Sequence, residues 1–225
     1  CRYIGIYYFF IIIFGIYLSI PVVSGIGEES RKKVFSYAII TAFTVNSLLP
    51  FTAVLSGGKI IHNGEFSFYA VSGYLIYVFI GYYLDNYEIG KTGRCLVYVF
   101  GLLGLLVHFF GTWYLSYRDN RIVTLLKGYV SVPCVLYSSS VFLAFRQIPF
   151  NKFPKRLLRA ITYFSGQTFG IYLIHIPLMT VAERVFDISP QRFLSRILFA
   201  IVLFIVSGFI IKLLQKIPII KHIVP

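Results

Sequence analysis

Residues 193–214 read FLSRILFAIVLFIVSGFIIKLL, an apolar run whose charged side chains, Arg196 and Lys212, lie close to its two ends. A helix needs about 20 consecutive apolar residues to cross the hydrocarbon core of a bilayer, and this run is long enough to do so. Similar runs occur at residues 3–23, 34–55, 67–84, 95–115, 128–145 and 161–182. The sequence therefore predicts an all-α, polytopic transmembrane helix bundle with about seven spans.

The composition also favours a membrane protein over a water-soluble one. Hydrophobic residues make up 58% of the 225 residues, charged residues make up 13%, and the mean hydropathy is +0.80. Soluble proteins carry roughly a quarter charged residues. About seven spans with short loops use the whole chain, so we expect a single transmembrane domain over residues 1–225.

The distribution of Lys and Arg predicts the orientation. Thirteen of the 21 basic residues fall on the side that holds the loops 24–33, 85–94 and 146–160 and the C-terminal end. Cytoplasmic loops retain positive charge, so we expect a multi-pass protein of the cytoplasmic (inner) membrane with a cytoplasmic C-terminus. The basic residues are dispersed between apolar runs, so the net charge of +13 indicates contact with membrane lipid and no nucleic-acid partner.

The first residue bears on what precedes this sequence. The chain starts at Cys1 and its one methionine is Met179, so we expect an N-terminal part to be missing. A first span that enters from outside predicts that an odd number of spans precede it. The three cysteines are scattered and suit neither a disulfide framework nor a metal site.

Two histidines lie inside predicted spans, where ionisable groups are candidates for function. Helical spacing places Thr168, Tyr172 and His175 on one face of their span. The functional interpretation is a polar pocket in the outer half of the bundle, where His175 deprotonates a hydroxyl or binds a sugar. The alternative is a neutral histidine that hydrogen-bonds to a neighbouring helix. His108 has no polar face around it, which favours a packing role.

Other intramembrane polar residues are Asn46, Gln167 and the run 138–140. Serines can bond to carbonyls of their own helix, so the serine run is expected to be structural. The side-chain amides of Asn46 and Gln167 find hydrogen-bond partners within their own helix less easily, and one of them is expected to face the pocket. No carboxylate lies in the middle of a span, which disfavours a proton-driven transporter.

The densest positive charge lies in the loop 146–159. Its basic residues are Arg146, Lys152, Lys155, Arg156 and Arg159. These side chains could hold the phosphates of a nucleotide-containing donor such as coenzyme A through charge-assisted hydrogen bonds. The alternative is that they keep the loop in the cytoplasm and contact lipid phosphates.

Three segments together resemble acyltransferase family 3, the multi-span acyl-CoA acyltransferases that modify sugars and surface polysaccharides. They are FYAVSGYLIYVFIGYYL at 68–84, SGQTFGIYLIH at 165–175 and LLQKIPIIK at 213–221. The resemblance implies an integral-membrane O-acyltransferase that moves an acyl group, acetyl in particular, from acyl-CoA to a hydroxyl of a sugar or cell-surface glycan. It makes His175 and Tyr172 catalytic candidates and implies no metal.

The same resemblance implies that a catalytic residue lies outside this sequence. The family has about ten spans, so three would precede this sequence, an odd number. Its best supported catalytic histidine belongs to the first of those spans, and no residue here matches it. This fragment alone is therefore expected to be inactive. The alternatives are a polysaccharide exporter or other polytopic transporter, and a structural membrane subunit.

Overall fold

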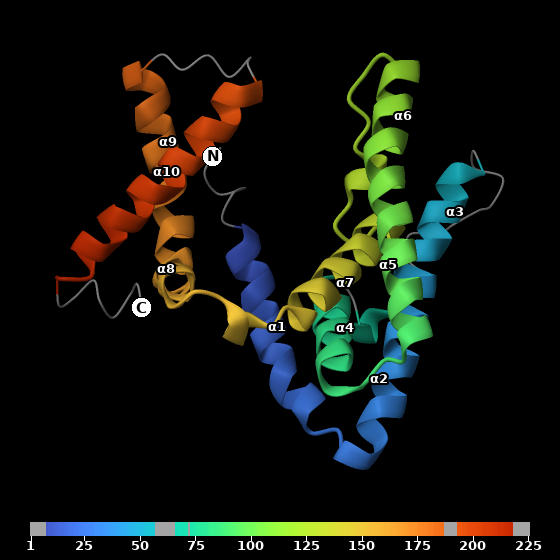
Figure 1. The fold of residues 1–225 in the computed structure, drawn as a ribbon. Coiled ribbons are helices and arrows are strands. Elements are labelled where there is room, and N and C mark those ends of the chain that lie inside the picture. Colours follow the sequence, from blue (N-terminus) through green and yellow to red (C-terminus); the bar gives the residue numbers. More distant parts are fainter. Residues whose placement is uncertain (1–7, 57–65, 72, 187–192, 218–225) are drawn as a thin grey trace. The chain divides into compact units, whose positions relative to one another are not determined.

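The computed structural model describes residues 8–56, 66–71, 73–186 and 193–217. All regular secondary structure in these ranges is helical, which confirms the all-α prediction (Figure 1). The chain divides into two compact units, Cys1–Ile148 and Pro149–Pro225, and each is described by itself. The single-domain interpretation stays a prediction.

The first unit contains seven α-helices among its described residues. They are α1 (Tyr8–Ser24), α2 (Glu28–Ala42), α3 (Leu49–Leu55), α4 (Leu75–Asn86), α5 (Lys91–Leu106), α6 (Thr112–Arg118) and α7 (Val132–Gln147). Short π-helical segments, Phe43–Leu48 and Val107–Gly111, join α2 to α3 and α5 to α6 into two continuous rods. Single 3₁₀ turns occupy Tyr69–Val71 and Leu125–Lys127.

The second unit begins with a 3₁₀ turn, Phe150–Lys152. Three helices follow: α8 (Lys155–Ser165), α9 (Thr168–Phe186) and α10 (Phe193–Leu214). The bounds of α10 are those of the apolar run that decides the fold class.

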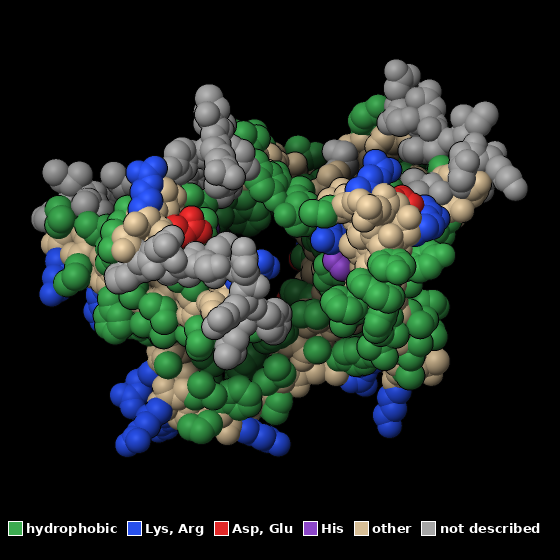
Figure 2. Space-filling view, turned by 90° about the horizontal axis from the view of Figure 1, so that it is seen from above, with side chains coloured by type: hydrophobic (Ala, Val, Ile, Leu, Met, Phe, Trp, Pro, Cys, Tyr) green, Lys and Arg blue, Asp and Glu red, His purple; other side chains and the backbone are tan. Residues whose placement is uncertain are grey.

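Four stretches of the described chain are long and apolar enough to cross a membrane. They are Glu28–Ala53, Lys91–Arg118, Leu125–Gln147 and Ser195–Leu214, and the apolar helix Tyr8–Ser24 is shorter. Apolar side chains such as Leu102, Phe109 and Ile201 are exposed on these helices, as expected for surfaces that face lipid. Hydrophobic side chains make up much of the face shown in Figure 2. A membrane protein is thus confirmed, whereas a count of seven spans is not.

Two predicted spans differ from the helices observed. In the run 67–84 the helix begins only at Leu75, because the chain first makes a 3₁₀ turn and Gly73 adopts a φ of +57°, which breaks the helical path. The run 161–182 is divided between α8 and α9 at Gly166 and Gln167, and glycine is a poor helix former. Apolar content could not reveal these interruptions.

The core of the first unit lies where α2, α4 and α7 meet. Phe35 and Ala42 of α2, Ile76 and Phe79 of α4, and Val135 of α7 are buried there. The ring centroids of Phe35 and Phe79 are 4.6 Å apart in an edge-to-face arrangement, which suits aromatic quadrupoles.

Glycines set the approach of α5 to α7. A Cβ atom on Gly101 would lie 2.2 Å from Ser140 Oγ, and one on Gly104 would lie 2.9 Å from the carbonyl oxygen of Pro133. Small residues at such positions let two backbones come close, and close packing is what holds helices together in lipid. These contacts fix the register of α5 on α7.

Candidate functional site

His175 lies half-buried on α9, and its ring bonds to its own helix. Nδ1 is 2.7 Å from the carbonyl oxygen of Tyr172 and 3.2 Å from that of Ile171. A carbonyl oxygen can only accept a hydrogen bond, so in the neutral ring Nδ1 carries the proton and donates. Nε2 then keeps its lone pair, which is the state that a general base requires.

The structure brings Tyr172 close to His175, as the helical spacing predicts. The two ring centroids are 5.6 Å apart, and the rings are tilted by 37°. Thr168, the third residue of the predicted face, is exposed and donates its hydroxyl to the carbonyl of Phe164 at 3.1 Å. On this face of α9, Tyr172 and His175 lie next to each other, whereas the Thr168 hydroxyl already donates to a backbone carbonyl.

Gln167 and Ser207 carry unpaired polar atoms in the interior of the second unit. Gln167 is 5% exposed and Ser207 is fully buried, and neither Gln167 Oε1 nor Ser207 Oγ has a hydrogen-bond partner. Gly208 of α10 packs closely here, because a Cβ on it would lie 3.2 Å from Gln167 Oε1. Sequence reasoning pointed to Gln167 and missed Ser207.

Asn46, by contrast, uses its whole side-chain amide. Nδ2 donates to the carbonyls of Val71 at 3.0 Å and Phe68 at 3.3 Å, and Oδ1 accepts from Ser67 Oγ at 3.0 Å and the Phe68 amide at 2.8 Å. Two donors and two acceptor positions are the full capacity of this group. Asn46 thus fastens the segment before α4 to the π-helical segment of the first rod.

Arg146 at the end of α7 is already bonded within the first unit. Its Nε lies 3.0 Å from Asp85 Oδ1, and its Nη2 donates to the Asp85 backbone carbonyl. The guanidinium therefore ties the end of α7 to the end of α4. The structure gives this residue a partner that the sequence did not indicate.

The other four predicted phosphate-binding residues belong to the second unit. Lys152, Lys155, Arg156 and Arg159 are all exposed, the last three on α8. The first turn of α8 has no side-chain cap, so its backbone amides can donate hydrogen bonds to a bound anion. The cations of Lys155, Arg156 and Arg159 lie in the N-terminal half of the same helix. An anion at this end would offset the unfavourable position of cations at a helix N-terminus.

His108 contacts two residues of another helix that the sequence alone did not indicate. Its Nδ1 lies 3.7 Å from Sγ of the buried Cys134, and its ring stands edge-on to that of Tyr137 with centroids 5.6 Å apart. Cys134 Sγ also lies 3.3 Å from Tyr137 Oη. We call these three residues the His108 cluster; it joins the π-helical segment after α5 to the start of α7.

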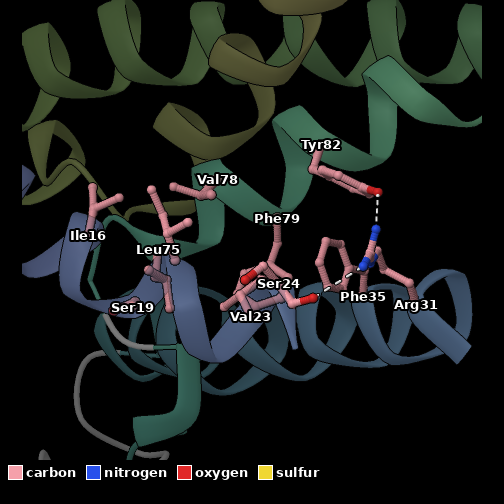
Figure 3. A pocket seen from close by; sticks show the side chains of 11 residues that line it. Ile16, Ser19, Val23, Ser24, Arg31, Phe35, Leu75, Val78, Phe79 and Tyr82 are labelled. Atoms are coloured by element: carbon pink, nitrogen blue, oxygen red, sulfur yellow. Dashed lines mark hydrogen bonds between the residues drawn. The ribbon is translucent and has the colours of Figure 1, made fainter. Parts of the chain in front are cut away.

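An apolar cavity of about 280 Å³ lies between α1, α2 and α4, with Arg31 at one end (Figure 3). Arg31 Nη1 donates to Tyr82 Oη at 3.0 Å, and Nε and Nη2 donate to the Ile26 carbonyl at 3.1 and 2.8 Å. These bonds fasten the turn after α1 to α4. The rest of the lining is nearly all apolar, which suits an alkyl chain better than acid–base chemistry.

The sequence matches a known protein family over almost its whole length. Residues 1–213 match the family model described as an acyltransferase domain. The chain belongs to acyltransferase family 3. No curated protein and no solved structure gives a significant match. As a member of acyltransferase family 3 with helices long and apolar enough to cross a membrane, the chain is a membrane acyltransferase, which confirms the resemblance found from the sequence.

Within acyltransferase family 3 the roles of individual residues here stay predictions. His175 and Tyr172 are together in the second unit, and the His108 cluster lies in the first. No group of three His, Cys, Asp or Glu side chains that could hold a metal occurs among the described residues. The His108 cluster was missed because its members come from two helices; the small residues Gly101 and Gly104 are the signal that such a close pairing exists.

Proposed function

We propose that this protein is an integral-membrane O-acyltransferase that moves an acyl group, acetyl in particular, from acyl-CoA to a hydroxyl of a sugar or cell-surface glycan. The observation that supports it most is the acyltransferase-domain match over residues 1–213. We further propose that it resides in the cytoplasmic (inner) membrane with its C-terminus in the cytoplasm. The excess of Lys and Arg on that side supports this orientation.

The proposed chemistry needs a base, a donor site and a site for the developing oxyanion. A base takes the proton of the acceptor hydroxyl, whose oxygen attacks the thioester carbonyl; the C–S bond then breaks, and the coenzyme A thiolate leaves and takes up a proton. His175 is the candidate for proton transfer, because its Nδ1 is bonded to the carbonyl of Tyr172 and its Nε2 lone pair remains. Tyr172 is the candidate hydroxyl donor beside it.

The donor site is assigned to the exposed cations of the second unit. Lys152, Lys155, Arg156 and Arg159 supply charge at the start of α8, and phosphate groups of acyl-CoA carry the complementary charge. Arg146 takes part less, because its guanidinium is bonded to Asp85. Lipid phosphates offer the same chemistry and are the alternative ligand.

Two substitutions of His175 separate a base from a structural residue. In His175→Asn the side-chain amide nitrogen takes the place of Nδ1 and can still donate to the Tyr172 carbonyl, whereas in His175→Gln the amide takes the place of Nε2. Neither variant can accept a proton. If His175 is the base, both should lose at least about 100-fold in kcat.

The assay uses the complete gene product with radiolabelled acetyl-CoA and isolated cell-surface glycan, and it measures ester-linked acetate. Thr180→Val is the matched control, since Thr180 lies on the same helix and only bonds back to the Ile176 carbonyl. Full activity in His175→Asn would assign His175 a structural role. No labelled glycan from the wild type with any acceptor would contradict the proposed function.

A further inference from the structure

The cavity between α1, α2 and α4 is elongated, and Arg31 lies at the end opposite Leu75 (Figure 3). Its volume is about 280 Å³. The wall from α4 consists of Leu75, Val78, Phe79 and Tyr82, whose spacing of three or four residues places them on one face of the helix. From residue 75 to residue 82 a helix rises about 10 Å, so the cavity follows the helix axis over that length.

The opposite wall belongs to α1, which packs loosely on the rest of the first unit. None of its residues is buried by the described parts of the chain. Ile16, Ile20 and Val23 line the cavity from successive turns of this helix. Side chains around an empty space lose dispersion contacts, and at membrane depth the material that fills an apolar space is hydrocarbon. The walls therefore suit an alkyl chain.

The two serines in the lining offer no free hydroxyl group. Ser19 donates to the Gly15 carbonyl at 2.9 Å, and Ser24 donates to the Pro21 carbonyl at 3.0 Å. Each bond stays within α1. Polar groups that can bind a ligand are thus confined to the end of the cavity that holds Arg31.

Arg31 and Tyr82 keep one donor each at that end. A guanidinium has five N–H groups. Nε donates to the Ile26 carbonyl, Nη2 to the Ile26 and Ser24 carbonyls, and Nη1 to Tyr82 Oη. One N–H of Nη1 therefore has no partner among the described residues. The Tyr82 hydroxyl accepts its bond from Arg31 and still has its own proton to donate.

The charge of Arg31 is not paired with a carboxylate. Both ion pairs in the described parts of the chain involve other residues, although Glu28 and Glu29 lie in the first turn of the same helix. Lys32 and Lys33 add two exposed cations next to Arg31. A phosphate diester would supply the opposite charge and could accept both free donors. The cavity is thus apolar along its length and cationic at one end.

We propose that this cavity binds one acyl chain of an anionic phospholipid, with the lipid phosphate bonded to Arg31 Nη1 and Tyr82 Oη. The charge distribution places the loop 24–33 on the cytoplasmic side. Basic pockets between helices on that side are suited to anionic lipid head groups. The bound lipid fills the space between α1 and α4 and takes no part in acyl transfer, so the inference goes beyond the proposed function.

Photo-crosslinking locates the bound chain. The complete gene product in detergent is incubated with phosphatidylglycerol that carries a diazirine on one acyl chain, and peptide mass spectrometry identifies the residues labelled on irradiation. We expect label on α1 and on residues 75–82 of α4. Unlabelled phosphatidylglycerol should compete about fivefold better than phosphatidylcholine with the same chains, because its net negative charge complements Arg31.

The variants assign the label to the two ends of the site. Arg31→Gln removes the charge and should weaken labelling about fivefold. Val78→Phe fills the space and should abolish labelling of α1 and α4, although Arg31 is unchanged. Lys33→Gln is the matched control, because it removes an equal charge from the same helix at an exposed position outside the cavity, and it should be labelled like the wild type.

Folding of each variant is checked by size exclusion and helix content. Arg31 also fastens the turn after α1 to α4, so Tyr82→Phe replaces Arg31→Gln if the latter does not fold. This variant keeps the aromatic ring and removes one of the two free donors. It should weaken labelling in the same direction.

The outcomes decide between a lipid site and its alternatives. Cavity labelling that prefers phosphatidylglycerol and falls in Arg31→Gln and Val78→Phe supports the proposal. Equal competition by phosphatidylcholine, or undiminished labelling in both cavity variants, would overturn it. An equal loss in Lys33→Gln would reduce the effect to general surface charge and would also overturn it. Stronger competition by a long-chain acyl-CoA would replace the lipid with an acyl-CoA chain, and absence of label from α1 and α4 would show that other parts of the protein fill the space.

Discussion

His108 Nδ1 lies 3.7 Å from Cys134 Sγ, across the interface between the rod of α5 and α6 and the start of α7. The two residues are far apart in sequence, and Tyr137 Oη completes the group at 3.3 Å from the same sulfur. The π-helical segment Val107–Gly111, which carries His108, widens the helix at this point. Such segments often mark functional sites in helical proteins.

His108 should shield the Cys134 thiol. Cys134 is 4% exposed, whereas Cys95 on α5 is exposed. In His108→Ala the imidazole is gone and a space opens beside the sulfur, so alkylation of Cys134 by N-ethylmaleimide should rise severalfold. Peptide mass spectrometry gives the labelled fraction of each cysteine, and Cys95 reports reagent access.

The matched control for this experiment is Phe109→Ala. Phe109 follows His108 on the same segment but is 65% exposed. Its removal should leave Cys134 as unreactive as in the wild type. Equal labelling of Cys134 in the wild type and in His108→Ala would contradict the shielding role.

Gly104 should not tolerate a larger side chain. A Cβ there would lie 2.9 Å from the backbone carbonyl of Pro133, so α5 and α7 would have to separate. We expect Gly104→Val to lower the free energy of unfolding by about 1–3 kcal/mol, as overpacked interiors do. Thermal or SDS-induced unfolding in detergent micelles measures the change.

Gly15 provides the comparison, because no atom lies within 4 Å of a Cβ added to it. Gly15→Ala should keep or slightly raise stability, since alanine is the better helix former by about 0.5–1 kcal/mol. A similar loss in both variants would show that the approach of α5 to α7 is not what limits residue 104.

Asn46 should be a stability determinant of the first unit. Its replacement by Ala leaves the Phe68 amide and the Val71 carbonyl without their partner. Unpaired groups of this kind cost about 1–3 kcal/mol each, and we expect a total loss of about 2 kcal/mol after local rearrangement. Unfolding measured as above tests this, with Asn86→Ala as control because exposed Asn86 only bonds back to the Tyr82 carbonyl.

These contacts show which features the sequence could predict. The bounds of α10 follow from one uninterrupted apolar run, since hydropathy and length alone decide such a helix. The pairing of Tyr172 with His175 follows from helical spacing on one element. Both depend only on local information.

Features that involve two elements were not predictable in the same way. His108 meets Cys134, Arg146 meets Asp85 and Asn46 meets Val71 only because particular helices pack in a particular register. The π-helical segments add a further difficulty, since an inserted residue changes which side chains share a face. The positive φ of Gly73 likewise interrupts a run that hydropathy treats as continuous.

The basic residues of the loop 146–159 should differ in their effect on acyl-CoA. Arg146 is bonded to Asp85, whereas Lys155, Arg156 and Arg159 are exposed on α8 and form no ion pair with any residue that the structure describes. We therefore expect replacement of all three α8 cations by Gln to raise the KM for acetyl-CoA at least tenfold, a change of about 1.4 kcal/mol.

Arg146→Gln should change this KM less than twofold and should lower stability by less than about 1 kcal/mol, as loss of an exposed ion pair does. Asp85→Asn is the matched control, because it breaks the same pair from the other side. A larger effect on KM from Arg146→Gln than from the α8 variant would move the donor site to the end of α7. An unchanged KM in the α8 variant, with weaker binding to vesicles that contain anionic lipid, would assign these cations to lipid phosphates instead.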